Sequence, residues 1–251
     1  MFLVIGACVA FEQARPVLLE REARKPPNLP TGKSALRRDA GFPAARALAP
    51  VDFIRHNWRV RIIGGSAGGL FLKAPKGLDV RPTPDLVRQA LFNSLAPRIE
   101  GARVLELFGG TGALSLECLS RGAREALCIE LSPKHARIIE QNCASLNLPV
   151  NSFRVRVQDV FTALPQLAAA GERYDLIVAD PPYGEKNVGK RSESFAQRCL
   201  DNETLPRLLA PGGLFVLGHA RRDTLTLPER WHERKFMKHG DSIMRFLEVK
   251  E

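Results

Sequence analysis

The chain has 251 residues, enough for one large α/β domain with an appendage. Lys and Arg outnumber Asp and Glu by 37 to 27, and this basic balance favours an anionic partner such as a nucleic acid. The cysteines form no C-x-x-C pair, so they indicate free thiols in a reducing, cytoplasmic compartment rather than a disulfide or metal framework. They are Cys8, Cys118, Cys128, Cys143 and Cys199.

Residues 1–59 differ in character from the rest of the chain. They are rich in Pro, Ala and Arg and show no sustained period of 3.6 or 2, so we expect them to be disordered. The apolar opening, 2–11, has no Lys or Arg before it and is far too short for a membrane span, which argues against a signal peptide and a membrane partner. The organised domain is therefore expected over 60–251.

The organised part opens with a glycine-looped hairpin. Two β-prone runs, 60–63 and 70–73, flank the glycine-rich residues 64–69, which predicts an N-terminal β-hairpin extension within 60–76. Pro82-Thr83-Pro84 is typical of the entry to a helix, and an amphipathic pattern follows over 85–95.

Beyond this helix, short β-prone runs alternate with helical stretches such as 133–146. The alternation predicts a doubly wound, mostly parallel, Rossmann-like α/β sheet. Two last runs, 233–237 and 244–249, flank His239-Gly240-Asp241 and predict a final antiparallel pair, which brings the sheet to seven strands. The five expected parallel strands are 103–107, 126–129, 153–157, 176–179 and 214–217.

Candidate ligand-binding residues follow three of these strands, at the edge of the sheet where such folds bind ligands. The first strand leads into a glycine turn that lets a ligand approach the backbone. Glu130 ends the second strand, where an acid accepts hydrogen bonds from ribose hydroxyls, and Asp159-Val160 follow the third, where they can bind adenine. For Glu130 and Asp159 the alternative is a helix N-cap or a surface acid. The candidate cofactor residues are Glu106, Phe108, Gly109, Gly110, Thr111, Gly112, Glu130, Asp159 and Val160.

Two cofactors compete for this pocket. NAD binding requires G-x-G-x-x-G, but Gly110 and Gly112 are followed by Ser115, and Glu106 would repel a pyrophosphate. That acid suits the ammonium of a methionine moiety. S-adenosylmethionine carries no phosphate, so the pocket favours this cofactor, and the expected chemistry needs no metal.

The fourth strand ends in Asp180-Pro181-Pro182-Tyr183, which we interpret as a rigid catalytic ledge. A nucleobase amino group is a poor nucleophile, so a catalyst must hold both N–H groups with acceptors. The Asp180 carboxylate and the Pro181 carbonyl supply two, while the prolines fix φ and offer no competing N–H donor. Tyr183 supplies a face for a base taken out of its stack. The alternative is a proline-rich loop after a buried strand.

These motifs resemble the RsmD-like guanine-N2 methyltransferases of small-subunit ribosomal RNA, within the class I S-adenosylmethionine-dependent fold. The resemblance runs from Val60 to the C-terminus. It implies a guanine amino group as the acceptor, ribosomal RNA or the small subunit as the partner, and a sheet with a reversed last strand. The chain departs from the family at Glu106, usually Asp, and at Gly109, usually Ala. The most specific segments are 61–65, 81–85, 87–93, 108–113 and the ledge.

The resemblance also bears on residues 1–59. Family members begin with Met directly before Arg-Ile-Ile-Gly-Gly, where this chain has Val60, so we expect 1–59 to be an over-extended gene model. The competing interpretation is a genuine disordered basic arm that helps to hold RNA.

Two other functions use the same features. A DNA adenine-N6 methyltransferase would use the ledge, but it needs a target-recognition insertion for which this domain has no room. A non-catalytic RNA-binding or ribosome-assembly protein would be expected to lose the ledge or the glycine turn. We therefore expect a monomeric methyltransferase that grips RNA with basic residues, for which solvated surface charge is the alternative. These residues are Arg59, Arg61, Lys73, Lys76, Arg81, Lys186, Lys190 and Arg191.

Overall fold

The computed structural model describes residues 60–75, 85–184 and 190–250. The expectations for residues 1–59, including Arg59, lie outside these ranges, as do Lys76, Arg81 and Lys186. The expectations for residues 1–59 therefore stay predictions.

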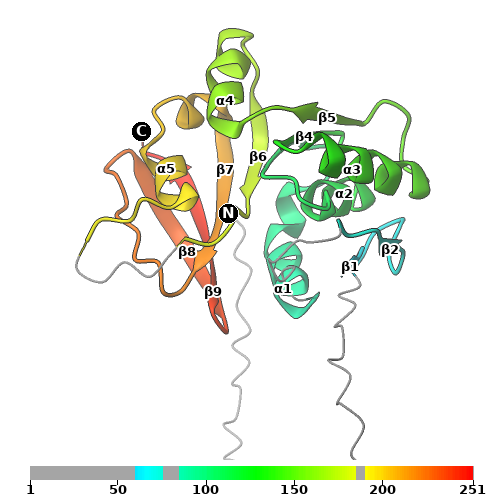
Figure 1. Ribbon diagram of the computed structural model, residues 1–251, viewed down its shortest axis with the longest axis horizontal. Coiled ribbons are helices and arrows are strands. Elements are labelled where there is room, and N and C mark those ends of the chain that lie inside the picture. The colour runs from blue at the N-terminus through cyan, green and yellow to red at the C-terminus, as the bar shows by residue number, and fades with distance from the viewer. Residues whose placement is uncertain (1–59, 76–84, 185–189, 251) are drawn as a thin grey trace, which may run out of the picture. The chain divides into compact units, whose positions relative to one another are not determined.

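A seven-stranded sheet in the order β5-β4-β3-β6-β7-β9-β8 forms the centre of the described residues (Figure 1). Strands β5, β4, β3, β6 and β7 are parallel, whereas β9 pairs antiparallel with both β7 and β8. The last strand of the chain is thus an interior strand. The bounds are β3 Arg103–Leu107, β4 Glu125–Glu130, β5 Phe153–Val157, β6 Tyr174–Ala179, β7 Leu209–Ala220, β8 Trp231–His239 and β9 Ser242–Val249.

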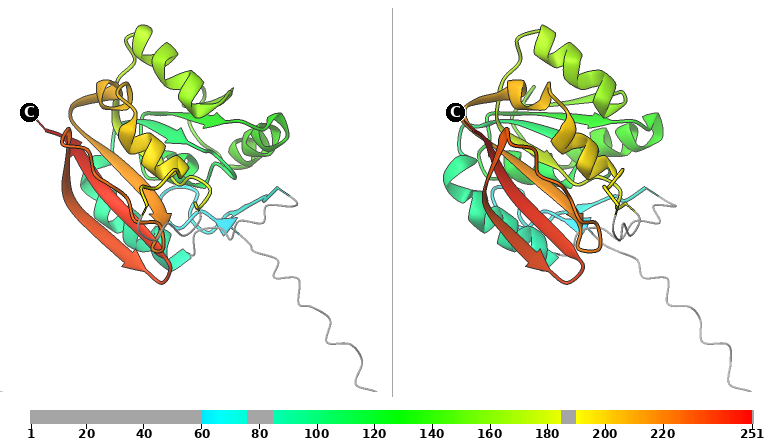
Figure 2. Two further views of the ribbon diagram at one scale, coloured as in Figure 1. Left: turned by 60° about the vertical axis from the view of Figure 1, so that its left-hand side comes forward. Right: turned by 90° about the vertical axis from the view of Figure 1, so that its left-hand side faces the viewer.

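Helices cover both faces of this sheet (Figure 2). The alternation of side chains along each strand decides which face a residue joins: Leu105 and Leu107 of β3 pack with α4 and α5, whereas Val104 packs with α1 and α2. The helices are α1 Asp85–Leu95, α2 Ala113–Ser120, α3 Pro133–Ser145, α4 Val160–Ala169 and α5 Phe195–Asp201, with short 3-10 turns at η1 Ala96–Arg98 and η2 Leu205–Leu208.

Side-chain caps fix the starts of α3 and α4, the helices that follow β4 and β5. Ser132 accepts from the His135 N–H at the start of α3, and Pro133 follows it at a position where no N–H is needed. Asp159 accepts from the Thr162 N–H at the start of α4. These caps end the turns at the carboxyl edge of the sheet, so the loops between strand and helix stay short there.

The hairpin joins β1 Val60–Arg61 to β2 Phe71–Leu72, and both strands are shorter than the sequence predicts. The reason is the buried carboxylate of Glu117 in α2, which accepts hydrogen bonds from the backbone N–H groups of Ile63 (2.6 Å) and Gly64 (2.9 Å). These residues therefore bond to α2 instead of to the opposite strand.

The fold class and the element types expected from the sequence are confirmed. The helix over 85–95 matches α1, and the reversed final pair matches β8 and β9. Strand β7 begins five residues before the expected 214 and continues to Ala220, because it pairs with β6 on one side and with β9 on the other.

Candidate functional site

A cavity of about 410 Å³ opens at the carboxyl ends of β3, β4, β5 and β6, a volume in the range of small-ligand sites. It brings together residues that the sequence places in four separate strand-to-helix turns. Eight of the nine candidate cofactor residues line it, and Gly112 does not. The eight are Glu106, Phe108, Gly109, Gly110, Thr111, Glu130, Asp159 and Val160.

Gly112 has a structural position at the start of α2 instead. It is the N-cap of α2 with φ of 74°, in the left-handed region that favours glycine, and a side chain there would run into Ile139 of α3. Gly109 is closely packed in the same way, because an added Cβ would overlap Cys128 Sγ. The turn therefore needs its glycines to pass between two helices and a strand.

Glu130 shapes the glycine turn from the end of β4. One carboxylate oxygen accepts from the Gly110 N–H and the other from the Ser132 N–H, both at 2.8 Å. Both oxygens keep further lone pairs, so the carboxylate can hold the turn and still accept from ribose hydroxyls in the cavity.

Glu106 lies at the base of the cavity, 2% exposed, and accepts from the Ser115 N–H at 3.0 Å. Burial raises the pKa of Glu106 to about 7, against the opposing effect of the hydrogen bonds from Ser115. An ammonium group beside it would favour the ionised form. This carboxyl is thus suited to a cationic ligand group.

Asp159 fulfils the alternative role considered for it, since it caps α4, and it also lines the cavity. Its Oδ1 accepts from both the N–H and the hydroxyl of Thr162, at 3.0 and 3.2 Å. The cap fixes the orientation of the Asp159 side chain, and the residue still lines the cavity.

An aromatic wall closes one side of the cavity. Phe108 has a positive φ of 62°, uncommon for a residue with a side chain, and its ring packs 5.6 Å from that of Phe195. Phe195 begins α5 and lines the same cavity. The strained turn after β3 therefore sets the position of an apolar surface that lines the cavity.

The ledge starts directly after β6. Asp180 and Pro182 line the cavity, while Pro181 is buried. The Asp180 side chain lies against the backbone of β7, where a Cβ on Gly218 would overlap Asp180 Oδ1. Gly218 thus leaves the space that this carboxylate occupies.

Tyr183 lies at the far end of the ledge, half-buried, outside the residues that line the cavity. Its hydroxyl bonds to the hydroxyl of Ser242 at 2.7 Å, at the start of β9. Burial raises the pKa of Tyr183 above its ordinary value, and the nearby Asp180 adds to the rise, so the phenol is neutral at physiological pH. The bond to Ser242 holds the hydroxyl end of the Tyr183 side chain against the start of β9.

The four described basic residues of the expected RNA surface make different contacts. Arg61 forms an ion pair with Asp85 at 2.7 Å, and Arg191 forms one with Asp201 at 2.6 Å. Lys73 donates to Gln141 at 3.2 Å, and Lys190 is exposed. They do not gather around the cavity, so their contact with RNA stays a prediction.

Sequence reasoning missed several residues that line the cavity. The most informative is Arg88, which is buried, because an arginine on an amphipathic helix three residues after Asp85 is typical of a surface ion pair. Leu131 and Ser132 directly follow Glu130 and could have been found from that position. The other missed residues are Val60, Ala113, Leu114, His135 and Phe195.

The described residues contain no group of three or more His, Cys, Asp or Glu side chains that could hold a metal ion. Among them, no helix has the length and apolar character needed to cross a membrane. Cys118, Cys128 and Cys199 are buried free thiols, as the sequence predicts, whereas Cys143 is half-buried.

The cavity fits S-adenosylmethionine by the chemistry of its donors and acceptors. Its lining offers carboxylates that can accept hydrogen bonds from ribose hydroxyls and from an ammonium, and a buried arginine with donors that have no partner among the described residues. Glycines at the first turn leave room for close approach to the backbone.

Comparison with known proteins gives a family. The model of the family described as "Conserved hypothetical protein 95" matches residues 60–248. "Putative rRNA methyltransferase YlbH" of Bacillus subtilis is 35% identical over 129 residues, which are 51% of this chain and 70% of that protein. "Ribosomal RNA small subunit methyltransferase D" of Escherichia coli K12 is 39% identical over 125 residues, 50% of this chain and 61% of that protein. The solved structure of "Putative methyltransferase yhhF" from Escherichia coli is 29% identical, with a TM-score of 0.63 over 76% of this chain and 98% of that one.

Proposed function

The chain belongs to the conserved hypothetical protein 95 family of RsmD-like, S-adenosylmethionine-dependent methyltransferases, and from this premise we propose that it methylates the exocyclic N2 amino group of a guanine in small-subunit (16S) ribosomal RNA. The observation that carries the proposal is the position of Asp180. It lines the same cavity as the cofactor acids Glu106, Glu130 and Asp159, so an acceptor held by the ledge meets the cofactor in one chamber.

The ledge supplies the hydrogen-bond acceptors that an amino nucleophile requires. The Asp180 carboxylate and the Pro181 carbonyl take one N–H each, which orients the nitrogen lone pair toward the cofactor. Neither proline has an N–H to compete for these acceptors. The carboxylate also stabilises the positive charge that develops on the nitrogen.

The cofactor, when bound, supplies an activated methyl group. Tyr183 offers its face to the target base, and the bond from its hydroxyl to Ser242 limits rotation of the ring. Phe108 and Phe195 keep water away from one side of the chamber. The basic residues of the hairpin and of the loop after the ledge attract the RNA backbone, including the exposed Lys190.

The proposal is tested by mapping methylated guanines in both ribosomal RNAs from a strain that lacks this gene. One guanine of the small-subunit RNA is expected to lose its N2 methyl group. The purified protein should restore that methyl group from S-adenosylmethionine, on naked RNA or on the assembled subunit, and mass spectrometry should identify the product as N2-methylguanosine.

Three outcomes would contradict the proposal. Loss of a methyl group from the large-subunit RNA in the deletion strain would make that RNA the substrate. Methylation of adenine in DNA would make the N6 amino group of adenine the acceptor held by the ledge. If the protein methylates none of the tested nucleic acids but binds the small subunit normally, a non-catalytic role in assembly would be favoured.

A further inference from the structure

Arg88 carries the further inference because it is a buried cation with unused donors at a ligand cavity. Its side chain is 3% exposed and lines the chamber described above. Nη2 donates to Asp85 Oδ1 at 2.7 Å, but Nε and Nη1 are buried without a hydrogen-bond partner among the described residues.

Such an arrangement is costly in the absence of a ligand. A buried donor that loses water and gains no partner destabilises a protein by roughly 1 to 3 kcal/mol, and the penalty is larger for a charged group. The Asp85 carboxylate does not remove the cost, because it is half-exposed and also accepts from Arg61. The cavity side of the guanidinium thus needs an anion.

The shape of the guanidinium specifies the kind of anion. Nε and Nη1 lie on opposite edges of the guanidinium, and Nη2 keeps a second N–H beside its bond to Asp85. That N–H together with Nε or with Nη1 presents a planar fork that matches two oxygens of one carboxylate or phosphate. A backbone phosphate of a large RNA is a poor candidate, because Arg88 as a whole residue is only 2% exposed. A small ligand that enters the cavity can reach the fork.

The packing of α1 decides on which side of the cavity Arg88 lies. Buried residues of α1 share one cluster with Val104 of β3 and Val178 of β6, so Arg88 belongs to the β3 and β6 side of the cavity. Asp159 follows β5 and Glu130 ends β4, the two strands on the side of β3 away from β6, and these acids suit adenine and ribose. Glu106 lies within β3, which pairs with β6, the strand that leads into Asp180. The amino-acid end of S-adenosylmethionine, which carries an ammonium and a carboxylate on one carbon, therefore belongs near Glu106.

We propose that Arg88 binds the α-carboxylate of S-adenosylmethionine while Glu106 binds the α-ammonium, so that the pair recognises the zwitterion. This inference rests on the proposed function, because it takes S-adenosylmethionine as the cofactor. It adds which residues recognise the amino-acid group of that cofactor. Arg88 thereby makes the protein select S-adenosyl compounds over nucleosides that lack the amino-acid group.

Calorimetry with two ligands tests the assignment without any methyl transfer. S-adenosylhomocysteine carries the amino-acid group, whereas 5′-methylthioadenosine has the same adenosine and sulfur without it. Arg88→Met should weaken binding of S-adenosylhomocysteine about 10- to 100-fold, as expected when a charged hydrogen bond is lost. Binding of 5′-methylthioadenosine should change less than about twofold, since that ligand has no carboxylate.

Arg98→Met is the matched control, because Arg98 follows the same helix but pairs with Glu248 at 3.0 Å and not with the cavity. It should leave both affinities unchanged. Arg88→Lys should recover part of the loss for S-adenosylhomocysteine, because a point charge replaces the fork.

Two results would overturn the assignment. Equal loss of both ligands in Arg88→Met would show a structural role, and unchanged S-adenosylhomocysteine affinity with a raised KM for RNA would assign Arg88 to a phosphate. Because the assay needs no RNA, a protein that shows the Arg88 dependence but methylates no ribosomal RNA would refute the proposed function and leave this inference standing.

Discussion

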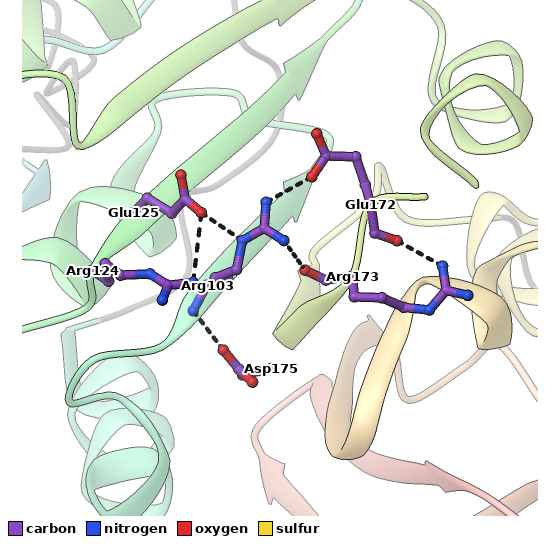
Figure 3. Close-up of polar contacts among 6 residues, drawn as sticks. All are labelled: Arg103, Arg124, Glu125, Glu172, Arg173 and Asp175. Atoms are coloured by element: carbon purple, nitrogen blue, oxygen red, sulfur yellow. Dashed lines mark hydrogen bonds and ion pairs between the residues drawn. The ribbon is translucent and has the colours of Figure 1, made fainter. Parts of the chain in front are cut away.

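At the amino-terminal edge of the parallel strands, Arg103 uses Nε, Nη1 and Nη2 on protein partners (Figure 3). Arg88, which lines the cavity at the carboxyl edge, leaves Nε and Nη1 without a partner among the residues that the structure describes. The partners of Arg103 are Glu125, the Arg173 carbonyl and Glu172, and Asp175 accepts from its backbone N–H at 2.8 Å.

The difference separates two uses of charge in one sheet. A closed network ties the starts of β3, β4 and β6 together and contributes to stability. At the other edge, the two Arg88 donors that have no partner among the described residues should lower stability in the absence of a ligand. Substitutions at the two edges should therefore affect different measurements.

The largest expected effect is that of Asp180→Ala, which should lower methyl transfer at least about 100-fold, because orientation of the nucleophile is lost. Affinity for S-adenosylmethionine should stay within a few-fold. A tritiated-methyl assay beside calorimetry measures both. Asp175→Ala removes an acid from the other end of β6 and is the matched control, expected to keep turnover. Near-normal turnover of Asp180→Ala would remove Asp180 from the reaction.

Gly218→Ala should displace the Asp180 carboxylate without changing Asp180 itself. The new Cβ overlaps Asp180 Oδ1, so the side chain must move, and kcat should fall about 10- to 100-fold while the cofactor dissociation constant is retained. Gly212→Ala, on the same strand, meets no atom within 4 Å but has a φ of 71°, so it controls for general loss of stability. Equal loss of kcat in both variants would contradict the specific displacement of Asp180.

Glu130→Ala should weaken cofactor binding by about 1.5 to 3 kcal/mol, since a charged acceptor is lost. Turnover at saturating cofactor should largely survive. Glu130→Gln keeps one oxygen and should lie between the two. A dissociation constant that does not change in Glu130→Ala would show that the acid holds the Gly110 turn alone.

The pH dependence of Glu106 should appear in both binding and stability. Its pKa of about 7 lies above its ordinary value of 4.5, so the folded protein binds the proton more tightly than the unfolded chain. The contribution of Glu106 to the unfolding free energy should therefore fall as pH rises from 4.5 to 7. Cofactor binding needs the carboxylate and should weaken, by up to about tenfold per pH unit, as pH falls below 7. Calorimetry from pH 5.5 to 8 should show this slope in the wild type and lose it in Glu106→Gln; the same slope in both would exclude Glu106.

The smallest expected effect is on stability alone. Arg103→Met should lower the unfolding free energy by about 1 to 2 kcal/mol, a modest value because the side chain is 26% exposed. Cofactor affinity should not change. Arg88→Met should be no less stable than the wild type, because it removes two unsatisfied donors. Chemical denaturation of both variants without ligand compares the edges directly, and greater destabilisation by Arg88→Met would contradict the difference between them.

Much of the fold could be predicted from the sequence because local patterns carried it. The run Arg103–Leu107 alternates between two buried faces, and Pro133 follows a capping serine at the start of α3. The strand-end acids could be placed at one edge because parallel strands share their direction. Those signals come from neighbouring residues in the chain.

The remainder depended on partners far away in sequence. The hairpin strands are short because Glu117, more than 50 residues later, accepts the N–H groups of Ile63 and Gly64. Arg88 resembles an exposed helical arginine until packing buries it beside the cavity. No local pattern marks Gly218 as the residue that gives Asp180 its space, since the contact joins two strands.

The interior position of β9 also affects how the protein is made. A nascent chain that has not yet released residues 242–249 presents the edge of β7, twelve residues long, with no partner. Unpaired strand edges recruit other chains and lead to aggregation. Until β9 is in place, Tyr183 also lacks the hydroxyl of Ser242. The pairing of β7 and the bond that holds Tyr183 are therefore completed at the same moment, when β9 inserts.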